Sequence, residues 1–580
     1  MIVVHVTHEA VEKIGGIGAV IAGLMNSQAY QEQVSRTILL GPLFDTGYAT
    51  GPRLGPLGTV LYSSIDGVSS DSYEKVFRPV ERSFDVRIVY GRRPVDDPCT
   101  GRVIEAEVLL VDVFHCNRDR LNVFKGLLSQ KFGVHSERFE KYWEYEQYVR
   151  LAEPGFEALR AIGCDGGSEP VVLLAHEYMG MPTALKAIAS DAPNTRTVFY
   201  AHEVASVRPI VEDHPGHDTM FYNVMEQACG RGQGLEELFA DVQKNYKHPL
   251  VKAARHCDHV FAVGDYVEAE MRFVDSHFKH VQIDRMYNGI PSQRIDAQGK
   301  QVSRNRMGDY AETLLGYRPT WVFTHVCRPV RSKGLWRDLG VLHALEPLLA
   351  ARKETATFFL LGTLGGVRRS RDVVQMERVY GWPVGHEEGY PDLSGGEEEL
   401  GGMVDHFNRD HESVRAVFVN QWGWNRAACG LRMSEDMTFA DIRRGTDVEL
   451  GLSIYEPFGI SQFEPLSFGA LCVVSNVCGC MGFARTVANG AMAANIIEGD
   501  FVTPASGMST PALLALGTTD RGRIEAAETQ RLAEIICDRL PRTDQQRDAL
   551  MASGAQFAER MSWDQVVQEY FLPSLRRTIE

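Results

Sequence analysis

The sequence LSIYEPFGISQFEPLSFGALCVVSNVCGCMG at residues 452–482 combines a turn, a helix and a strand within 31 residues. Its Tyr-Glu-Pro-Phe-Gly sequence at residues 455–459 is typical of a turn, because proline and glycine interrupt regular structure. A helix should begin near Phe458–Ile460, and the apolar run Leu471–Ser475 predicts a buried strand. Strand, turn, helix and strand in this order predict an α/β domain.

Two carboxylates lie eight residues apart in this stretch, Glu456 in the turn and Glu464 on the predicted helix. Free N–H groups at a helix N-terminus attract phosphate, so Phe458, Gly459 and Ile460 mark a candidate anion site. A carboxylate beside a phosphate makes sense when it holds neutral sugar hydroxyls. The pattern therefore favours a nucleotide sugar, although a turn residue and a solvated helix residue would explain either glutamate alone.

The same stretch resembles the donor-sugar motif of retaining glycosyltransferases with the GT-B fold, most of all the glycogen and starch synthases. Tyr455–Pro457 and Ser475–Phe483 are also similar to the eukaryotic-type glycogen synthases. The resemblance implies an α/β protein with two Rossmann-like domains that face across a cleft, and a C-terminal helix that crosses back to the N-terminal domain. We expect the acceptor-side domain at residues 1–300, the nucleotide-sugar domain at 301–555 and the returning helix at 556–580.

Composition limits the function classes. The 580 residues suffice for several domains, and 44% hydrophobic and 23% charged residues are typical of a soluble globular protein. We expect no membrane-spanning helix, because no run of about 18 apolar residues is present. Met1–Thr7 predicts a first strand and not a signal peptide, and eleven scattered cysteines indicate reduced thiols in a cytoplasmic protein. The net charge of −16 disfavours nucleic acid as a partner, but not a nucleotide or a neutral polysaccharide.

Three polar sequences follow predicted strands in the N-terminal half, where open α/β sheets bind ligands. A loop with Gly15 and Gly16 follows the first strand, and the pairs His176-Glu177 and His202-Glu203 end two later strands. Glycines in such a loop allow close approach to a ligand or a tight turn. The two His-Glu pairs fit a structural role as well as a functional one.

The resemblance assigns roles to these residues. Glycogen and starch synthases have a Lys-x-Gly-Gly loop after the first strand, which Lys13, Gly15 and Gly16 match, and its lysine faces the cleft near the donor phosphates and the acceptor. His202 matches a histidine that lies against the donor sugar, whereas Glu203 departs from the small or amide residue that usually follows. His176 and Glu177 match a strand end of the family, and Asn288 lies in an Asn-Gly-Ile element that closes the N-terminal domain.

Two cations lie on one predicted loop of the C-terminal half. A polar interval around Arg294–Arg318 predicts the interdomain linker, and the strand beginning at Trp321–Val326 leads into Arg328 and Lys333. An arginine and a lysine five residues apart can straddle a diphosphate, the first through a forked contact and the second as a point charge. They match the family's Arg-x-x-x-x-Lys-Gly motif, whereas Arg331 is extra and is expected at the rim.

By resemblance, the reaction is transfer of glucose from ADP-glucose or UDP-glucose to an α-1,4-glucan with retention. No metal ion or other cofactor is expected, the partners would be the nucleotide-sugar donor and the glucan acceptor, and a homo-oligomer is possible. The catalytic residues would be His202, Arg328, Lys333 and Glu456. The donor would contact Lys13, Gly15, Gly16, Asn288, Phe458, Gly459, Ile460 and Glu464, and His176 and Glu177 would line the acceptor side or the cleft.

Alternatives stay open from the sequence. A GT-B glycosyltransferase could use another sugar or acceptor and make a disaccharide or a surface polysaccharide. A non-catalytic glucan-binding scaffold would have no need of Arg328, Lys333, Glu456 and Glu464 together. A phosphorylase on the same fold would need a lysine for pyridoxal phosphate, and no motif for one is present. The sequence does not decide between ADP-glucose and UDP-glucose as the donor. It also does not identify the acceptor, the oligomeric state or an effector site.

Overall fold

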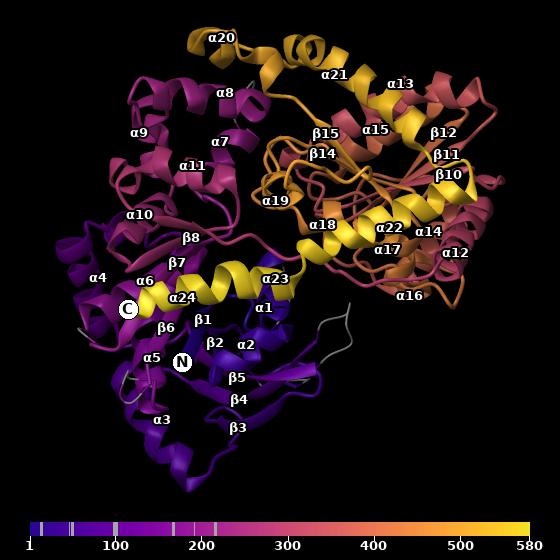
Figure 1. The fold of residues 1–580 in the computed structure, drawn as a ribbon. Coiled ribbons are helices and arrows are strands. Elements are labelled where there is room, and N and C mark those ends of the chain that lie inside the picture. The colour runs from indigo at the N-terminus through magenta and orange to yellow at the C-terminus, as the bar shows by residue number, and fades with distance from the viewer. Residues whose placement is uncertain are drawn as a thin grey trace. The chain divides into compact units, whose positions relative to one another are not determined.

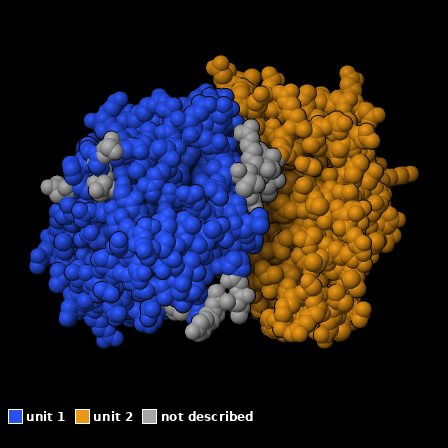
Figure 2. All heavy atoms as spheres, turned by 90° about the horizontal axis from the view of Figure 1, so that it is seen from below, with its two compact units in different colours: residues 1–209, 228–289, 563–580 blue, residues 210–227, 290–562 orange. Residues whose placement is uncertain are grey.

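The computed structural model describes residues 1–11, 15–45, 47, 52–96, 103–164, 167, 169–190, 192–213 and 217–580. The chain forms two compact units, which Figure 2 shows in different colours. The first unit consists of residues 1–209, 228–289 and 563–580, and the second of residues 210–227 and 290–562.

The first unit is built on a nine-stranded sheet in the order β3-β4-β5-β2-β1-β6-β7-β8-β9 (Figure 1). The neighbours from β5 to β9 pair in parallel, and β4 is antiparallel to both β3 and β5. The strands are β1 Ile2–Val6, β2 Arg36–Leu43, β3 Thr59–Ser63, β4 Ile88–Asp96, β5 Val103–Asp112, β6 Val171–His176, β7 Thr195–Ala201, β8 His259–Ala262 and β9 Ile283–Arg285. The helices are α1 Gly16–Asn26, α2 Gln28–Gln33, α3 Asp71–Phe84, α4 Arg118–Phe132, α5 Trp143–Ala161, α6 Glu177–Ala189, α9 Leu235–Leu238, α10 His248–Ala253, α11 Asp265–Val274, α23 Trp563–Val566 and α24 Leu572–Ile579.

The second unit is built on a six-stranded, entirely parallel sheet in the order β12-β11-β10-β13-β14-β15. Its strands are β10 Trp321–Val326, β11 Ala356–Leu361, β12 Val414–Val419, β13 Val448–Gly451, β14 Leu471–Ser475 and β15 Ile496–Gly499. Its helices are α12 Ala297–Leu315, α13 Leu335–Ala350, α14 Ser370–Tyr380, α15 Glu397–Asp410, α16 Arg426–Cys429, α17 Phe439–Gly445, α18 Ile460–Phe463, α19 Gly479–Ala488, α20 Thr510–Leu514, α21 Thr518–Arg539 and α22 Asp544–Arg560. Most of α7 Arg208–Asp213 and α8 His217–Gly230 belongs to this unit as well.

The core of the second unit follows from the apolar strands. Successive side chains of a strand point to opposite faces. In β10, Trp321 and Phe323 therefore join a core cluster on one face, and Val322 and Val326 join a second cluster on the other. A strand buried on both faces needs helices on both, as in a parallel α/β sheet.

The C-terminal segment returns to the first unit, where Figure 1 shows it in yellow beside α1. Trp563 packs so closely on α1 that a Cβ atom at Gly23 would lie 2.0 Å from its ring. Gly289 gives the ring similar room, with a Cβ position 2.6 Å away. Two glycines thus create the space that seats Trp563. The prediction of two mostly parallel α/β domains with a returning C-terminal segment is confirmed.

One prediction about local structure was wrong. The interval Arg294–Arg318 is not a linker but contains helix α12 of the second unit. Its polar residues make contacts inside the unit, since Lys300 donates to the Thr446 carbonyl at 3.1 Å and Arg304 to Asp447 at 2.9 Å.

None of the helices in the described ranges is long and apolar enough to cross a membrane.

Candidate functional site

Two loops meet at one edge of the second sheet. Strands β10 and β13 are parallel neighbours, so the loops that follow them leave the sheet at the same edge. The carbonyl of Ser332, in the loop after β10, accepts hydrogen bonds from the N–H groups of Ile454 (2.8 Å) and Tyr455 (3.2 Å), in the loop after β13. These backbone bonds hold the Arg328–Lys333 loop against the turn that contains Glu456.

Lys333 and Glu456, which were predicted from separate motifs, form an ion pair. The Lys333 Nζ donates to Glu456 Oε2, which also accepts from Gln462 Nε2 at 3.0 Å. Both side chains are mostly buried, with 17% and 10% of their surface exposed. Arg328 in the same loop is exposed and has no ion pair with a described residue. A ligand phosphate could reach Arg328 directly, whereas at Lys333 it would compete with Glu456.

The helix after Glu456 begins where the sequence predicted but is short. Gly459 has φ +90°, and α18 covers only Ile460–Phe463 before a 3₁₀ turn at Glu464–Phe468. Pro465 explains the change, because proline lacks the N–H that the next α-helical hydrogen bond requires. Phe458 is buried. A single turn offers few free N–H groups, so the predicted contacts of Phe458, Gly459 and Ile460 with the donor stay predictions.

Glu464 belongs to a buried network that the sequence did not reveal. Its carboxylate lies 3.1 Å from Nε of Arg443, which also lies 3.2 Å from the carboxylate of Glu449. Arg443 and Glu449 are buried, and 24% of the Glu464 side chain is exposed. Arg443 therefore orients Glu464, which is the carboxylate of this network that reaches solvent. The sequence carried one sign of the network, because Glu449 lies inside the short and otherwise apolar strand β13.

Arg337 is a second residue that motif reasoning missed. It is buried in α13 and donates to the carbonyls of Leu452 and Ser453, both at 3.1 Å. Its charge is balanced by Glu525 at 2.7 Å. Arg337 thereby fixes the backbone just before the turn with Glu456.

In the first unit, the two His-Glu pairs interlock at the ends of β6 and β7. Nδ1 of His176 lies 2.7 Å from Nε2 of His202, and Glu177 Oε1 accepts from the backbone N–H of Glu203 at 2.6 Å. Glu177 has φ +60°, a strained conformation that costs on the order of 1–3 kcal/mol and is typical of functional sites. Its Oε2 is buried without a hydrogen-bond partner among the described residues.

The protonation of this cluster is set by burial. Burial, with the nearby Glu203 carboxylate, raises the pKa of Glu177 well above its ordinary value. Burial also lowers the pKa of His202 to about 3. His202 is therefore a neutral imidazole at pH 7, which suits a hydrogen bond to a sugar hydroxyl better than an ionic contact to phosphate.

The glycine loop and Asn288 lie at other strand ends of this unit. Gly15 precedes α1 and Gly16 is its exposed first residue, while Lys13 lies outside the described residues. The N–H of Gly18 in the first turn donates to Glu9 Oε2 at 2.8 Å, so a carboxylate of the chain occupies part of this helix end. Asn288 is buried, and its Oδ1 has no partner among the described residues.

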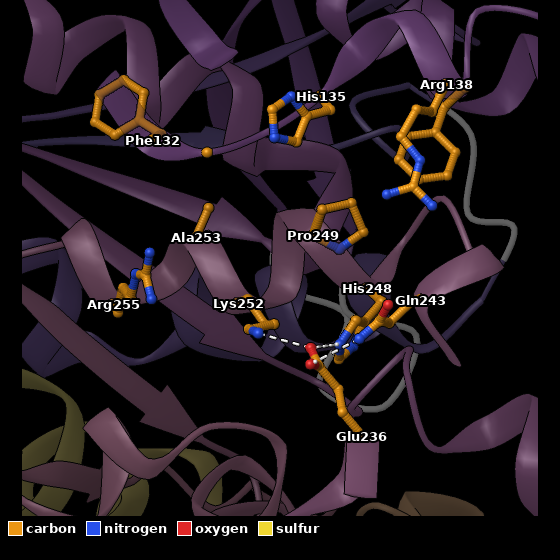
Figure 3. Close-up of a pocket in the computed structure, with 12 residues that line it drawn as sticks. Phe132, His135, Arg138, Glu236, Gln243, His248, Pro249, Lys252, Ala253 and Arg255 are labelled. Carbon is orange, nitrogen blue, oxygen red and sulfur yellow. Dashed lines mark hydrogen bonds and ion pairs between the residues drawn. The ribbon is translucent and has the colours of Figure 1, made fainter. Parts of the chain in front are cut away.

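A cavity of about 250 Å³ in the first unit lies apart from these predicted residues (Figure 3). Glu236 stands in it between Lys252 and His248, at 2.6 and 2.8 Å. Glu236 thus already pairs with two other groups of the wall. No predicted site residue within the described ranges lines it; its wall is formed by Phe132, Gly133, His135, Arg138, Phe139, Glu236, Gln243, His248, Pro249, Lys252, Ala253 and Arg255.

No family model and no curated protein matches the chain. Solved structures similar to it include a UDP-forming α,α-trehalose-phosphate synthase from Burkholderia xenovorans (12% identity, TM-score 0.49, 100% of this chain and 99% of that one). A trehalose-6-phosphate protein from E. coli bound with UDP-2-fluoro glucose has the same four values. The catalytic domain of starch synthase IV from Arabidopsis thaliana, bound to ADP and acarbose, has 15% identity and a TM-score of 0.46 over 98% of this chain and 100% of that one. With TM-scores below 0.5, these likenesses do not identify a reaction, and function has to be inferred from the residues of the site.

Proposed function

We propose that the chain is a retaining glycosyltransferase that transfers glucose from ADP-glucose or UDP-glucose to an α-1,4-glucan. The observation that carries the proposal is the meeting of Arg328, Lys333 and Glu456 on two loops at one edge of the second sheet. Cations suit a diphosphate and a carboxylate suits sugar hydroxyls. A nucleotide sugar contains both groups side by side.

Departure of the nucleoside diphosphate builds negative charge on its phosphates. Arg328 and Lys333 would stabilise that charge, and as preorganised groups they would act more strongly in the transition state than in the ground state. Lys333 forms an ion pair with Glu456. Binding of the diphosphate would release Glu456 from Lys333, so that the carboxylate becomes available to the sugar hydroxyls.

The remaining predicted residues have supporting roles in this proposal. Glu464, oriented by Arg443, would accept hydrogen bonds from ribose hydroxyls. His202 offers a neutral contact for a hydroxyl of the transferred sugar or the acceptor. Glu456 and Glu464 lie on the same loop region and are not expected to act as the acid and base of a glycosidase. No metal ion is required in this scheme, which stays a prediction.

The test is release of nucleoside diphosphate by the purified protein, given ADP-glucose or UDP-glucose, with and without glycogen. Release that depends on glycogen with one donor would support a glucan synthase and identify the donor. Release that depends on a small acceptor such as glucose, with a disaccharide as product, would support the glycosyltransferase activity but contradict the glucan as its acceptor. Absence of both release and donor binding would contradict the proposal and favour a glucan-binding scaffold.

A further inference from the structure

A chain of hydrogen bonds runs through the interior of the first unit and ends at His202. His5 in β1 has its Nε2 3.3 Å from the Tyr30 hydroxyl and its Nδ1 2.8 Å from Nε2 of His176. The other nitrogen of His176, Nδ1, is 2.7 Å from Nε2 of His202. At the opposite end, the Tyr30 hydroxyl is 2.9 Å from the hydroxyl of Thr37. Residues from β1, α2 and β2, together with His176 and His202 at the ends of β6 and β7, thus form one continuous path.

The path is buried from Tyr30 to His176, reaches the half-buried His202, and contains no charged group. His5 and His176 are fully buried, and Tyr30 is 2% exposed. The His176 ring stacks on those of His5 and His202, with centroids 5.1 and 5.0 Å apart and interplanar angles of 25° and 13°. Burial lowers the pKa of His5 and His202 to about 3, and burial, together with the nearby imidazoles of His202, His5 and His8, holds that of His176 well below its ordinary value. All three imidazoles are neutral at pH 7.

Neutral imidazoles in a row must all point the same way. Each has one N–H that donates and one nitrogen that accepts. If Tyr30 donates to His5, each ring donates to the next, and His202 carries its proton on Nδ1. If the order is reversed, His202 carries its proton on Nε2 and Tyr30 accepts from His5. The direction chosen at Tyr30 therefore decides what His202 presents at the far end.

The chemistry of the first link selects the direction. A phenol is a better donor than acceptor, and an unprotonated imidazole nitrogen is a good acceptor. Donation from Tyr30 to His5 is therefore the stronger arrangement, and the Thr37 hydroxyl can donate to the Tyr30 oxygen and strengthen it further. His202 Nδ1 has no hydrogen-bond partner among the described residues, so it is the open end of the path.

We propose that Tyr30, His5 and His176 form a tautomer relay that holds the proton of His202 on Nδ1, so that His202 presents an N–H donor to a sugar hydroxyl. The identity of that hydroxyl rests on the proposed function; the tautomer does not. Tyr30, His5 and His176 are positioning residues, because they act on the substrate only through His202. In this tautomer Nδ1 of His202 carries the proton and Nε2 accepts from His176. His202 therefore has no free lone pair for the substrate and does not serve as a base.

The tautomer can be measured directly by NMR on the full-length protein labelled with ¹⁵N-histidine, because protonated and unprotonated ring nitrogens have well-separated shifts. The spectrum of His202→Gln assigns the His202 signals by their loss. We expect the native protein to have His202 protonated on Nδ1. Protonation on Nε2 in the native protein would overturn the proposal without any further variant.

Tyr30→Phe removes only the hydroxyl that sets the direction. We expect it to give a mixture of the two His202 tautomers and to lower kcat about tenfold, the effect of one misplaced hydrogen bond. Tyr145→Phe is the matched control, since this buried tyrosine of the same unit loses a 2.8 Å bond to the Ser136 hydroxyl but lies outside the path. It should leave the tautomer and kcat unchanged.

The two proposals fail in different ways. An unchanged His202 tautomer in Tyr30→Phe would overturn the relay, whether or not the protein transfers sugar. A tautomer shift in a protein that releases no nucleoside diphosphate from either donor would leave the relay standing and contradict the proposed function. A tautomer shift with a loss of kcat that Tyr145→Phe does not share would support both.

Discussion

The loop residues Arg328, Lys333 and Glu456 of the second unit are charged and partly open to solvent, whereas the candidate histidines of the first unit, His176 and His202, are neutral. In the second unit Lys333 and Glu456 form an ion pair, and Arg328 is exposed beside it. In the first unit His176 and His202 are joined as neutral imidazoles. Both groups lie at the carboxyl ends of parallel strands, so the same position in a sheet supports two kinds of chemistry.

The difference follows from which partners the neighbouring elements supply. His325 in β10 and His5 in β1 are both fully buried histidines of a parallel strand. His325 has the carboxylate of Asp338 at 2.6 Å, while His5 has only another imidazole and a tyrosine hydroxyl. Burial lowers the pKa of both, but for His325 the neighbouring Cys327 and Asp338 outweigh burial and hold the pKa well above its ordinary value. One strand therefore buries a cation and the other a neutral ring.

Acid should destabilise the first unit more than the second. The pKa of His5 falls from 6.5 to about 3 on folding, and that of His176 is also lowered, so only the unfolded chain takes up these protons in mild acid. The contribution of each neutral histidine to the free energy of unfolding is complete above about pH 6.5 and is lost as the pH falls toward 3. Between pH 7 and pH 5, His5 and His176 should each lower the free energy of unfolding by about 2 kcal/mol. His325 has the opposite sign, because its folded pKa is raised and its contribution is lost only as the pH rises.

Hydrogen exchange measures this directly, by comparing the protection of β1 and β6 with that of β10 and β13 at pH 7 and pH 5, after correction for intrinsic rates. In His5→Gln one of these histidines is absent, so the fall in the first unit's free energy of unfolding between pH 7 and pH 5 should be smaller by about 2 kcal/mol. An equal loss of protection in both units would show that the neutral cluster does not govern acid stability.

Loss of either cation in the second unit should impair turnover. We expect Arg328→Ala and Lys333→Ala each to lower kcat by roughly 10²–10³, the range for removal of one preorganised charge stabiliser. Arg331→Ala is the matched control on the same loop, because its guanidinium donates to the Glu212 carbonyl at 2.9 Å and is predicted at the rim. It should change kcat by no more than about twofold.

The two cation variants should differ in stability. Lys333→Ala leaves the mostly buried Glu456 without its lysine, whereas Arg328→Ala removes an exposed side chain. Thermal unfolding should therefore show a lower midpoint for Lys333→Ala alone. Near-normal turnover in both variants would remove the basis of the proposed function.

The sequence predicted the fold where burial leaves a continuous apolar pattern. The strands at Trp321–Val326 and Leu471–Ser475 have the predicted bounds, since a strand covered on both faces is mostly apolar. It failed at α12, Ala297–Leu315, because that helix buries polar side chains against partners far away in sequence. The pairing of Lys300 with the Thr446 carbonyl leaves no local signal.

The site shows the same limit. Motifs pointed to Arg328, Lys333 and Glu456, and the structure places them on two neighbouring loops. Arg337, which fixes the backbone before Glu456, and Arg443, which pairs with Glu464, could not be predicted, since their partners come from other elements. His5 did carry a signal, as a histidine inside the apolar run of β1, but its meaning depends on His176, which is 171 positions away.

Glu464→Gln should have the smallest effect and test how the charged site is divided between binding and chemistry. The change keeps the size of the side chain and leaves Arg443 with Glu449, so the buried network survives. A charged acceptor for a ribose hydroxyl becomes a neutral one, which costs about 1 kcal/mol, or about fivefold in the donor KM, with kcat unchanged. A donor with deoxyribose in place of ribose gives a sharper test. If Glu464→Gln and the deoxyribose remove the same hydrogen bond, their effects on the donor KM should not add. Fully additive losses, or a fall in kcat instead of a rise in KM, would place Glu464 outside the ribose contact.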